Sequence, residues 1–322
     1  MGHPLAFVSF LNKIGAPVQR RLLASGLPAF VQDPDALVPL SRAWLLFDQA
    51  SRLDVPMAGW LAGQRAAEEN LNHVFLDKLK AAPTLYRALH RFIRMSTSES
   101  SHLRLWIRER KDDILLCTQH PSRRDEPGYM QSQLYQLQVL VSAIRQFAGS
   151  DWVPKELGVE HAPEPSVMIE QFPDCRIRRE QPAGYVAVSR THLHKAARRT
   201  KSENGDSADL NRIGDWNYAD VLRALLKPYL YEGYPTMRLA ADLMDTSPRT
   251  LARRLSAEGL GYRALVDEVR YAVAKERLCQ PHVRLSEVAW SVGFSDQSHF
   301  TRMFRRIGGV TPGQMRRAAV GG

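Results

Sequence analysis

The sequence predicts an α+β N-terminal domain followed by an all-α C-terminal domain with two helix-turn-helix units joined by a long linker helix. Three observations support this. Residues 102–120 alternate apolar and polar side chains with period two, as a β-hairpin does. After residue 216 the apolar residues recur at helical spacing almost throughout. Residues 198–215 are polar and aperiodic and contain two glycines, which indicates a linker between domains at 1–197 and 216–322.

The N-terminal part mixes helical and strand patterns. Residues 40–94 show the apolar spacing of several helices, and the hairpin at 102–120 turns around Lys111–Asp113. Shorter strand-like stretches follow, at 158–162, 175–180 and 184–189. This mixture is typical of an α+β fold.

One face of the first hairpin strand combines basic and aromatic side chains. Its residues are His102, Arg104, Trp106 and Arg108. Two interpretations stay open. The face lines a pocket that receives an acidic or aromatic small molecule, or it is a solvent-facing edge, because arginines are usually exposed.

A second apolar stripe suits contact between two helices. Met130, Leu134, Leu137, Val141 and Ile144 keep a 4-3-4-3 spacing, which predicts a helix that pairs with its copy in a second subunit. Burial of the same stripe against the domain's own sheet explains the spacing equally well.

The first helix-turn-helix unit is expected at 239–255. A short helix ends near Met244, and Ser247 then suits an N-cap, with Pro248 at the first helical position. If Leu251 and Leu255 point inward, Arg249 and Arg253 lie at roughly 160° and 200° around the helix axis from Leu251, on the side opposite the core. Outward arginines on the first turns of a helix suit the reading of guanine in the major groove. The predicted DNA contacts of this unit are Arg249, Thr250, Arg253 and Arg254, the last at a phosphate.

The second unit repeats this layout at 285–307. A short helix leads to a turn at Gly293, an expected cap at Ser295, and a second helix whose buried stripe is Phe300, Met303, Phe304 and Ile307. Amide, hydroxyl and guanidinium side chains occupy the positions of this helix outside the buried stripe. Such groups can form hydrogen bonds with base edges in the major groove. The predicted contacts here are Gln297, Ser298, His299, Thr301, Arg302 and Arg305.

A helix expected at 262–279 connects the two units. Its apolar positions are Leu265, Val269, Ala272, Val273 and Leu278. Eighteen residues span roughly 27 Å, against roughly 34 Å for one turn of B-DNA. A helix of that length is compatible with two recognition helices in successive major grooves.

These C-terminal motifs resemble the DNA-binding domain of AraC/XylS-type transcription regulators. The resemblance rests on SPRTLARRL, DEVRYAVAKERL, GFSDQSHFTRMFRR at Gly293–Arg306, and Thr311-Pro312 followed by Arg316. The resemblance implies base-facing positions for six residues: Arg249 and Arg253 in the first unit, and Gln297, Ser298, His299 and Arg302 in the second. The chain departs from the family pattern at Ile307-Gly308 and Met315, which are packing positions. The layout of the N-terminal part is similar to the arabinose-binding-like effector domain of one AraC branch.

Composition agrees with a nucleic-acid-binding protein. The chain carries a formal net charge of +10, and polyanionic partners are expected for such a balance. Residues 217–320 hold 16 Lys/Arg against 10 Asp/Glu, whereas the other 218 residues hold 28 against 24. The basic excess is therefore denser at the C-terminal end.

Other classes of protein find little support. The sequence has no uncharged apolar run long enough to span a bilayer, no signal-peptide pattern, and three widely spaced cysteines, so a reducing cytoplasm is expected. It lacks the motifs of Ser hydrolases, zinc proteases and nucleotide-binding enzymes, so no catalytic residue is predicted. His192 and His194 have no third ligand nearby, so no metal is expected.

The resemblance implies a sequence-specific DNA-binding transcription regulator, and an activator, because activation is the usual role in this family. Its expected partners are double-stranded promoter DNA, RNA polymerase and a second copy of the chain, with no cofactor and no membrane. The N-terminal domain would sense a small-molecule effector and support dimerisation. The alternatives are a constitutive regulator controlled by a protein partner without any small-molecule ligand, and an architectural DNA-binding protein of little sequence preference.

Overall fold

The computed structural model describes residues 4–29, 38–52, 55, 57–69, 79–99, 103–120, 126–161, 173–196, 217–280 and 283–320. The chain divides into two compact units. Unit 1 comprises Met1–Ser25 and Leu40–Gly214, and unit 2 comprises Gly26–Pro39 and Asp215–Gly322. Unit 1 contains a sheet and unit 2 is helical, so the predicted fold class is confirmed. The linker predicted at 198–215 lies outside the described residues.

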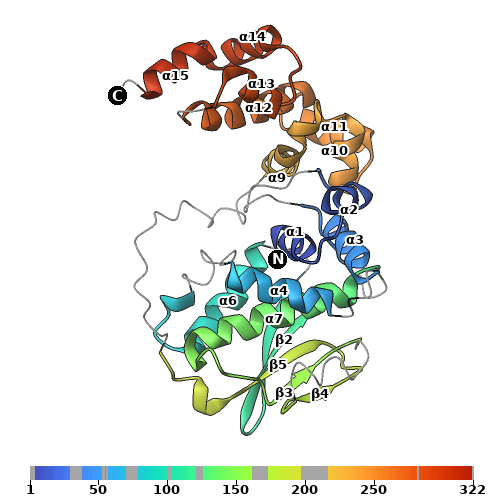
Figure 1. Ribbon diagram of the computed structural model, residues 1–322, viewed down its shortest axis with the longest axis vertical. Coiled ribbons are helices and arrows are strands. Elements are labelled where there is room, and N and C mark those ends of the chain that lie inside the picture. The colour runs from blue at the N-terminus through green and yellow to red at the C-terminus, as the bar shows by residue number, and fades with distance from the viewer. Residues whose placement is uncertain are drawn as a thin grey trace. The chain divides into compact units, whose positions relative to one another are not determined.

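Unit 1 packs helices on a five-stranded sheet (Figure 1). Its strands are β1 (Arg104–Glu109), β2 (Asp113–Gln119), β3 (Glu156–Gly158), β4 (Arg176–Arg178) and β5 (Gly184–Ser189), in the order β1-β2-β5-β3-β4. Its α-helices are α1 (Pro4–Lys13), α2 (Val18–Ala24), α3 (Leu40–Ser51), α4 (Ala58–Glu68), α6 (Leu85–Glu99) and α7 (Tyr129–Ala148), and a 3-10 turn, η1 (Arg190–His192), follows β5.

The predicted hairpin is confirmed by its register. β1 and β2 are antiparallel, with Trp106 opposite Cys117 and Arg108 opposite Leu115. β2 also pairs antiparallel with β5, so Cys117 lies opposite Tyr185. Because directly opposed residues share one face of a sheet, Trp106, Cys117 and Tyr185 lie side by side. Successive residues of a strand point to opposite faces of the sheet. The period-two pattern at 102–120 therefore reflects the alternation between the face that carries Trp106 and the opposite face, which is turned to α7.

α7 is the central helix of unit 1 and is buried along nearly its whole length. Leu134, Leu137, Val141 and Ile144 are each fully buried in the unit, and Met130 is half-buried. The 4-3-4-3 stripe is thus explained by packing inside its own domain, the second of the two interpretations above. Polar residues of α7 are buried as well and bond internally, for example Gln133, whose side-chain amide donates to Glu160 Oε1 over 2.8 Å.

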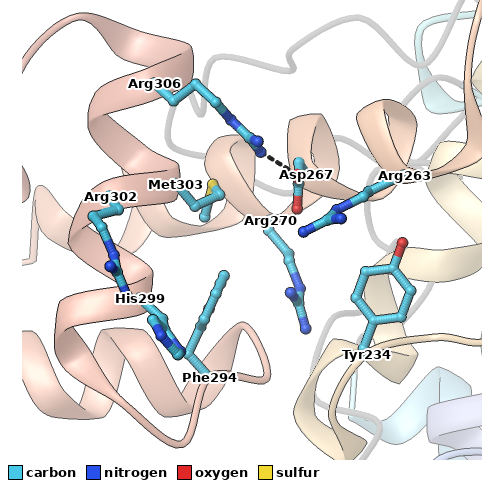
Figure 2. Close-up of a pocket in the computed structure, with 9 residues that line it drawn as sticks. All are labelled: Tyr234, Arg263, Asp267, Arg270, Phe294, His299, Arg302, Met303 and Arg306. Carbon is cyan, nitrogen blue, oxygen red and sulfur yellow. Dashed lines mark hydrogen bonds and ion pairs between the residues drawn. The ribbon is translucent and has the colours of Figure 1, made fainter.

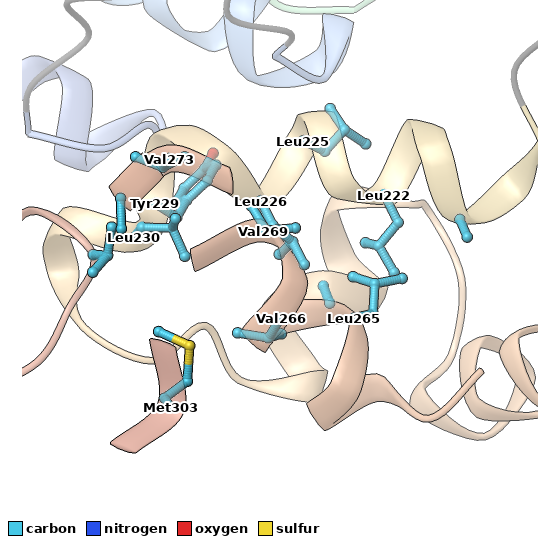
Figure 3. Close-up of a cluster of buried hydrophobic side chains, with 14 of the residues drawn as sticks. Leu222, Leu225, Leu226, Tyr229, Leu230, Leu265, Val266, Val269, Val273 and Met303 are labelled. Carbon is cyan, nitrogen blue, oxygen red and sulfur yellow. The ribbon is translucent and has the colours of Figure 1, made fainter. Parts of the chain in front are cut away.

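Unit 2 is a helical unit built on one hydrophobic core (Figure 3). Its elements are α9 (Tyr218–Leu226), η3 (Lys227–Glu232), α10 (Met237–Leu243), α11 (Pro248–Ala257), α12 (Tyr262–Leu278), α13 (Leu285–Ser291), α14 (Gln297–Gly308) and α15 (Pro312–Val320). Figure 3 shows members of this core from α9 and η3, with Val266 and Val269 of α12 and Met303 of α14. On α12, Val266 and Ala274 are buried, whereas Ala272, expected on the apolar face, is exposed.

A short segment from the first thirty residues belongs to unit 2. Leu27 is buried, and the Tyr229 hydroxyl donates to the Gly26 carbonyl over 2.9 Å. The backbone N–H of Ala29 donates to Glu232 Oε1, also over 2.9 Å. The helical unit is therefore assembled from two separate stretches of sequence.

The caps of the two recognition helices follow the sequence with one exception. Ser247 caps α11, where its hydroxyl accepts the Thr250 backbone N–H over 3.2 Å. The cap predicted at Ser295 is wrong, because α14 begins one residue later and Asp296 accepts the Ser298 N–H over 2.7 Å. A carboxylate is as good an N-cap as a hydroxyl and adds a favourable interaction with the helix dipole.

The glycine at 308, a departure from the family pattern, has a packing reason. A β-carbon there would lie 2.5 Å from the Tyr271 ring and hydroxyl. Tyr271 in turn packs on Phe304, with 4.7 Å between ring centroids. Ile307 and Met315 pack on the same core. Among the described residues, no helix combines the length and apolarity needed to cross a bilayer.

Candidate nucleic-acid interface

The recognition helix of the first unit, α11, has one buried and one exposed side. Leu251 and Leu255 are buried in the core, as predicted. Arg249, Arg253 and Arg254 are exposed. Thr250 is half-buried, and its hydroxyl accepts a hydrogen bond from Ser247 Oγ over 2.9 Å within the cap. The arginines are the groups that α11 offers to a partner.

Arg254 is held by an aromatic ring. Its guanidinium carbon lies 5.0 Å from the centroid of the Tyr218 ring at the start of α9. A cation over an aromatic face is attracted by the ring quadrupole, which limits the orientations of the side chain. A side chain restricted in this way would lose less conformational entropy on binding an anion.

The recognition helix of the second unit, α14, is similarly two-sided. Phe300, Met303 and Phe304 are buried, and Ile307 is half-buried, as the apolar stripe predicts. Thr301 is half-buried, and its hydroxyl donates to the Gln297 carbonyl over 2.8 Å. The remaining predicted contacts of this helix are exposed, namely Gln297, Ser298, His299, Arg302 and Arg305.

The two recognition helices belong to one packed body. Leu251 of α11 and Phe300 of α14 are part of the same core cluster, which also includes Leu265 and Val269 of α12. α12 has 17 residues and is therefore about 26 Å long. Shared packing fixes the spacing of the two helices, because a close-packed core resists continuous deformation.

The candidate effector residues of unit 1 lie on the outer face of the sheet. Trp106 packs against Leu115, Cys117, Tyr185 and Ala187. Arg104 and Arg108 are exposed, and the Arg108 guanidinium carbon lies 5.9 Å from the centroid of the Tyr185 ring. His102 lies outside the described residues. The structure therefore brings Trp106 and Arg108 to one aromatic centre, Tyr185.

A hydrogen-bond network borders this face. Glu156 accepts hydrogen bonds from the Tyr185 hydroxyl over 2.8 Å and from Arg110 Nη1 over 2.9 Å. Burial acts to raise the pKa of Glu156. The hydrogen bonds from Tyr185 and Arg110, with a further one from Arg178 Nε over 3.5 Å, outweigh burial and lower that pKa below its ordinary value. Burial, together with the Glu156 carboxylate, raises the pKa of Tyr185 to about 12.

Sequence reasoning missed a group of charged residues between the two helix-turn-helix units. They are Arg263, Asp267, Arg270 and Arg306, which line a cleft together with the predicted readers His299 and Arg302. A signal was present, because 263, 267 and 270 are spaced i, i+4 and i+7 and so share one face of α12. Asp267 and Arg270 are nevertheless buried on that face.

Comparison with known proteins gives the family. Residues 15–196 match the arabinose-binding domain of the AraC transcription regulator, and residues 240–318 match a helix-turn-helix domain. The regulator VirS of Mycobacterium tuberculosis is 43% identical over 102 residues, which are 32% of this chain and 30% of VirS. The regulator GlxA of Rhizobium meliloti is 34% identical over 133 residues, 40% of each chain. The chain thus covers less than half of the length of these relatives.

A solved structure gives a further comparison. The crystal structure of the transcriptional regulator CdpR from Pseudomonas aeruginosa aligns with 94% of this chain and 96% of its own, at 22% identity and a TM-score of 0.39. VirS and GlxA are both HTH-type transcriptional regulators. The family match spans more than half of the chain and includes both the sheet-containing and the helix-turn-helix parts. The chain therefore belongs to the AraC family of helix-turn-helix transcription regulators, with an N-terminal domain of the arabinose-binding type.

Proposed function

We propose that this regulator binds promoter DNA sequence-specifically through both helix-turn-helix units. The observation that carries the proposal is the pairing of two recognition helices on one core, each with exposed arginines on the side away from it. Arg249 and Arg253 would read bases in one major groove, and Arg302 and Arg305, with Gln297 and Ser298, would read the next. Thr250 and Thr301 contribute less directly, since their hydroxyls already bond within the helix.

The N-terminal unit would sense a small molecule. Trp106 packs against Tyr185, the Arg108 guanidinium lies over the Tyr185 ring, and Arg104 is exposed on the same strand. Such a set suits an aromatic or acidic effector, because carboxylates pair with guanidinium groups and rings stack on Trp and Tyr. Binding there would shift the population of the regulator between states of different DNA affinity. The name of the matched domain does not make the effector a sugar.

Three further roles complete the proposal. The protein would act in the cytoplasm, as an activator that contacts RNA polymerase, and as a homodimer. Four side chains of the α7 stripe are buried in their own unit, so the dimer surface would lie elsewhere in unit 1. Light scattering of the full-length protein at micromolar concentration tests the dimer, and a purely monomeric mass contradicts it.

The main test is a titration of the full-length protein on DNA. Fragments selected from a random library are compared with scrambled copies at about 150 mM salt, with and without a library of small aromatic and carboxylic acids. We expect a preference of at least about 10³-fold for the selected DNA, changed by one class of compound. Preference that no compound changes favours the constitutive alternative under a protein partner. Equal binding to both DNAs contradicts sequence-specific regulation.

A further inference from the structure

A cleft of about 640 Å³ lies between the two helix-turn-helix units of unit 2 (Figure 2). Its floor is one face of α12, with Arg263, Asp267 and Arg270. One wall is α14, which contributes His299, Arg302, Met303 and Arg306, with Phe294 of the preceding turn beside it. Tyr234, which precedes α10, forms the opposite wall.

The cleft is strongly basic. Among the described residues, four arginines line it, against a single carboxylate, Asp267. Asp267 is itself paired with Arg306. The positive charge of Arg263, Arg270 and Arg302 is therefore not balanced by the carboxylate that lines the same cleft, and a concave basic surface concentrates anions.

Arg270 is a buried cation at the base of this cleft. Its residue exposure is 5%, and its Nη2 donates to the Gly293 carbonyl over 3.1 Å. Within the described part of the chain, its buried Nε meets no hydrogen-bond acceptor. Figure 2 shows the side chain extending from α12 into the space between Phe294 and Tyr234. Burial of an incompletely bonded guanidinium is costly, and an anion in the cleft would offset part of this cost through its attraction to the positive charge.

The position of the cleft indicates which anion it would receive. If the two recognition helices enter successive major grooves on one side of the duplex, the minor groove between them faces α12. The two sugar–phosphate backbones that border this minor groove then pass over the cleft. His299 and Arg302, which line the cleft, are exposed residues of the recognition helix itself, so the basic surface is continuous with the base-reading surface.

From this arrangement we infer that the cleft is a phosphate clamp, in which Arg263, Arg270 and the Tyr234 hydroxyl bind DNA backbone phosphates between the two major grooves. The inference rests on the proposed function. It assigns to α12, the connecting helix, a direct part in DNA binding. Its contribution is positioning and affinity, not base preference, because phosphates carry no sequence information directly.

The test uses the full-length protein and the library-selected DNA. Arg263 is exposed, so Arg263→Gln removes one charge without disturbing the core. We expect the slope of log affinity against log salt to become about one unit shallower, and binding near 150 mM salt to weaken about tenfold. Base preference at every position of the selected site stays as in the wild type. Tyr234→Phe, which keeps the ring beside Arg270, weakens binding without changing the slope.

Lys275→Gln is the matched control. Lys275 is exposed on the same helix but lies roughly 120° around it from Arg263. We expect its slope and affinity to equal those of the wild type. The inference is overturned if Arg263→Gln behaves like Lys275→Gln, or if it alters preference at one base pair, since that would make Arg263 a base reader.

A second measurement separates DNA from a small anion. If millimolar inorganic phosphate raises the Tm of the DNA-free wild type but not of Arg263→Gln, at equal ionic strength, the cleft belongs to a small anion and the inference falls. Failure of the proposed function looks different, because the wild type itself would then bind selected and scrambled DNA equally. A shallower slope on both DNAs would support the clamp even in that case.

Discussion

The guanidinium of Arg270 lies over the ring of Phe294, with 4.3 Å between its central carbon and the ring centroid. The same group lies 4.9 Å from the ring centroid of Tyr234. Tyr234 lies in the segment that leads into α10 of the first helix-turn-helix unit, and Phe294 lies in the turn of the second, so one side chain of the connecting helix contacts the polypeptide at both. Burial lowers the pKa of Arg270, yet guanidinium groups remain charged at any ordinary pH. Arg270 is thus a cationic link between the two helix-turn-helix units.

Replacing Arg270 by Met should therefore destabilise unit 2. The change removes two cation–π contacts and the hydrogen bond to the Gly293 carbonyl, and we expect a loss of about 2–4 kcal/mol in the free energy of unfolding. Urea unfolding followed by circular dichroism measures it. Lys275→Gln, exposed on the same helix, should stay within about 0.5 kcal/mol of the wild type. Equal stability of the two variants would show that Arg270 is not a structural link.

Gly293 should tolerate no side chain. Its φ is +76°, and a β-carbon there would lie 2.5 Å from the Gly233 carbonyl oxygen and 2.6 Å from that of Leu230. Gly293→Ala therefore combines left-handed strain with a backbone collision, and we expect a loss of at least about 3 kcal/mol. Thermal or urea unfolding of the full-length variant checks this value.

Gly309 provides the control for that substitution. Its φ is +73°, but a β-carbon would meet no described atom within 4 Å. Gly309→Ala should cost only the left-handed strain, about 1 kcal/mol. If both alanine variants lose the same stability, the packing of Gly293 against the carbonyls contributes nothing.

Much of unit 2 was predictable because its cap residues and its helical spacing of apolar residues indicate the same helices. Ser247 with Pro248 marks the start of α11, and the buried pairs Leu251/Leu255 and Phe300/Phe304 follow directly from helical spacing. The cap of α14 was misplaced by one residue, since Ser295 and Asp296 are both good cap residues and only the backbone path selects between them.

Features that depend on distant contacts were not predictable. The segment that contains Gly26 and Leu27 joins unit 2 through Tyr229, some two hundred residues away, and no periodicity reports such a contact. Buried charged residues cannot be recognised from the sequence pattern either, because charged residues are normally expected at the surface. Asp267 and Arg270 are buried only because the fold brings Arg306 to the first and the rings of Tyr234 and Phe294 to the second. The α7 stripe fits two structures equally well at the level of spacing, and only burial decides between them.

The network around Glu156 predicts a pH dependence of stability. The folded state lowers the pKa of Glu156 through the bonds from Tyr185 and Arg110, despite the opposing effect of burial. A glutamate whose pKa is lower in the folded than in the unfolded state stabilises the fold at any pH above its unfolded pKa of about 4.3. This stabilisation is lost as the pH falls through the folded pKa. Glu156→Gln should therefore cost about 1 kcal/mol at pH 7, and its difference from the wild type should shrink below about pH 4.

A surface ion pair serves as the comparison for Glu156. Glu109 pairs with Arg190 over 3.0 Å, and both side chains are exposed. Glu109→Gln should change the free energy of unfolding by less than about 0.5 kcal/mol at any pH between 3 and 8. A pH-independent effect of Glu156→Gln would mean that charge plays no part in the network.

Arg302 should determine one position of the DNA site. It is exposed on α14, away from the buried Phe300 and Phe304. If its guanidinium contacts guanine, Arg302→Ala relaxes the preference at a single base pair and costs about 1–3 kcal/mol there. Selection from a random library with wild type and variant measures the change position by position. An unchanged selected motif would remove Arg302 from the base readers.

Arg254 should behave differently, as a phosphate contact. Its guanidinium is held over the Tyr218 ring, at 5.0 Å from the centroid, on the flank of the recognition helix α11. Arg254→Gln should weaken binding to all DNA sequences alike and make the salt slope shallower by about one unit. Tyr218→Leu keeps the charge of Arg254 but removes the ring that restricts its guanidinium. This variant should weaken DNA binding several-fold at an unchanged salt slope. Affinity titrations at four or more salt concentrations distinguish these outcomes. A change in base preference without a change in slope would instead place Arg254 in the major groove.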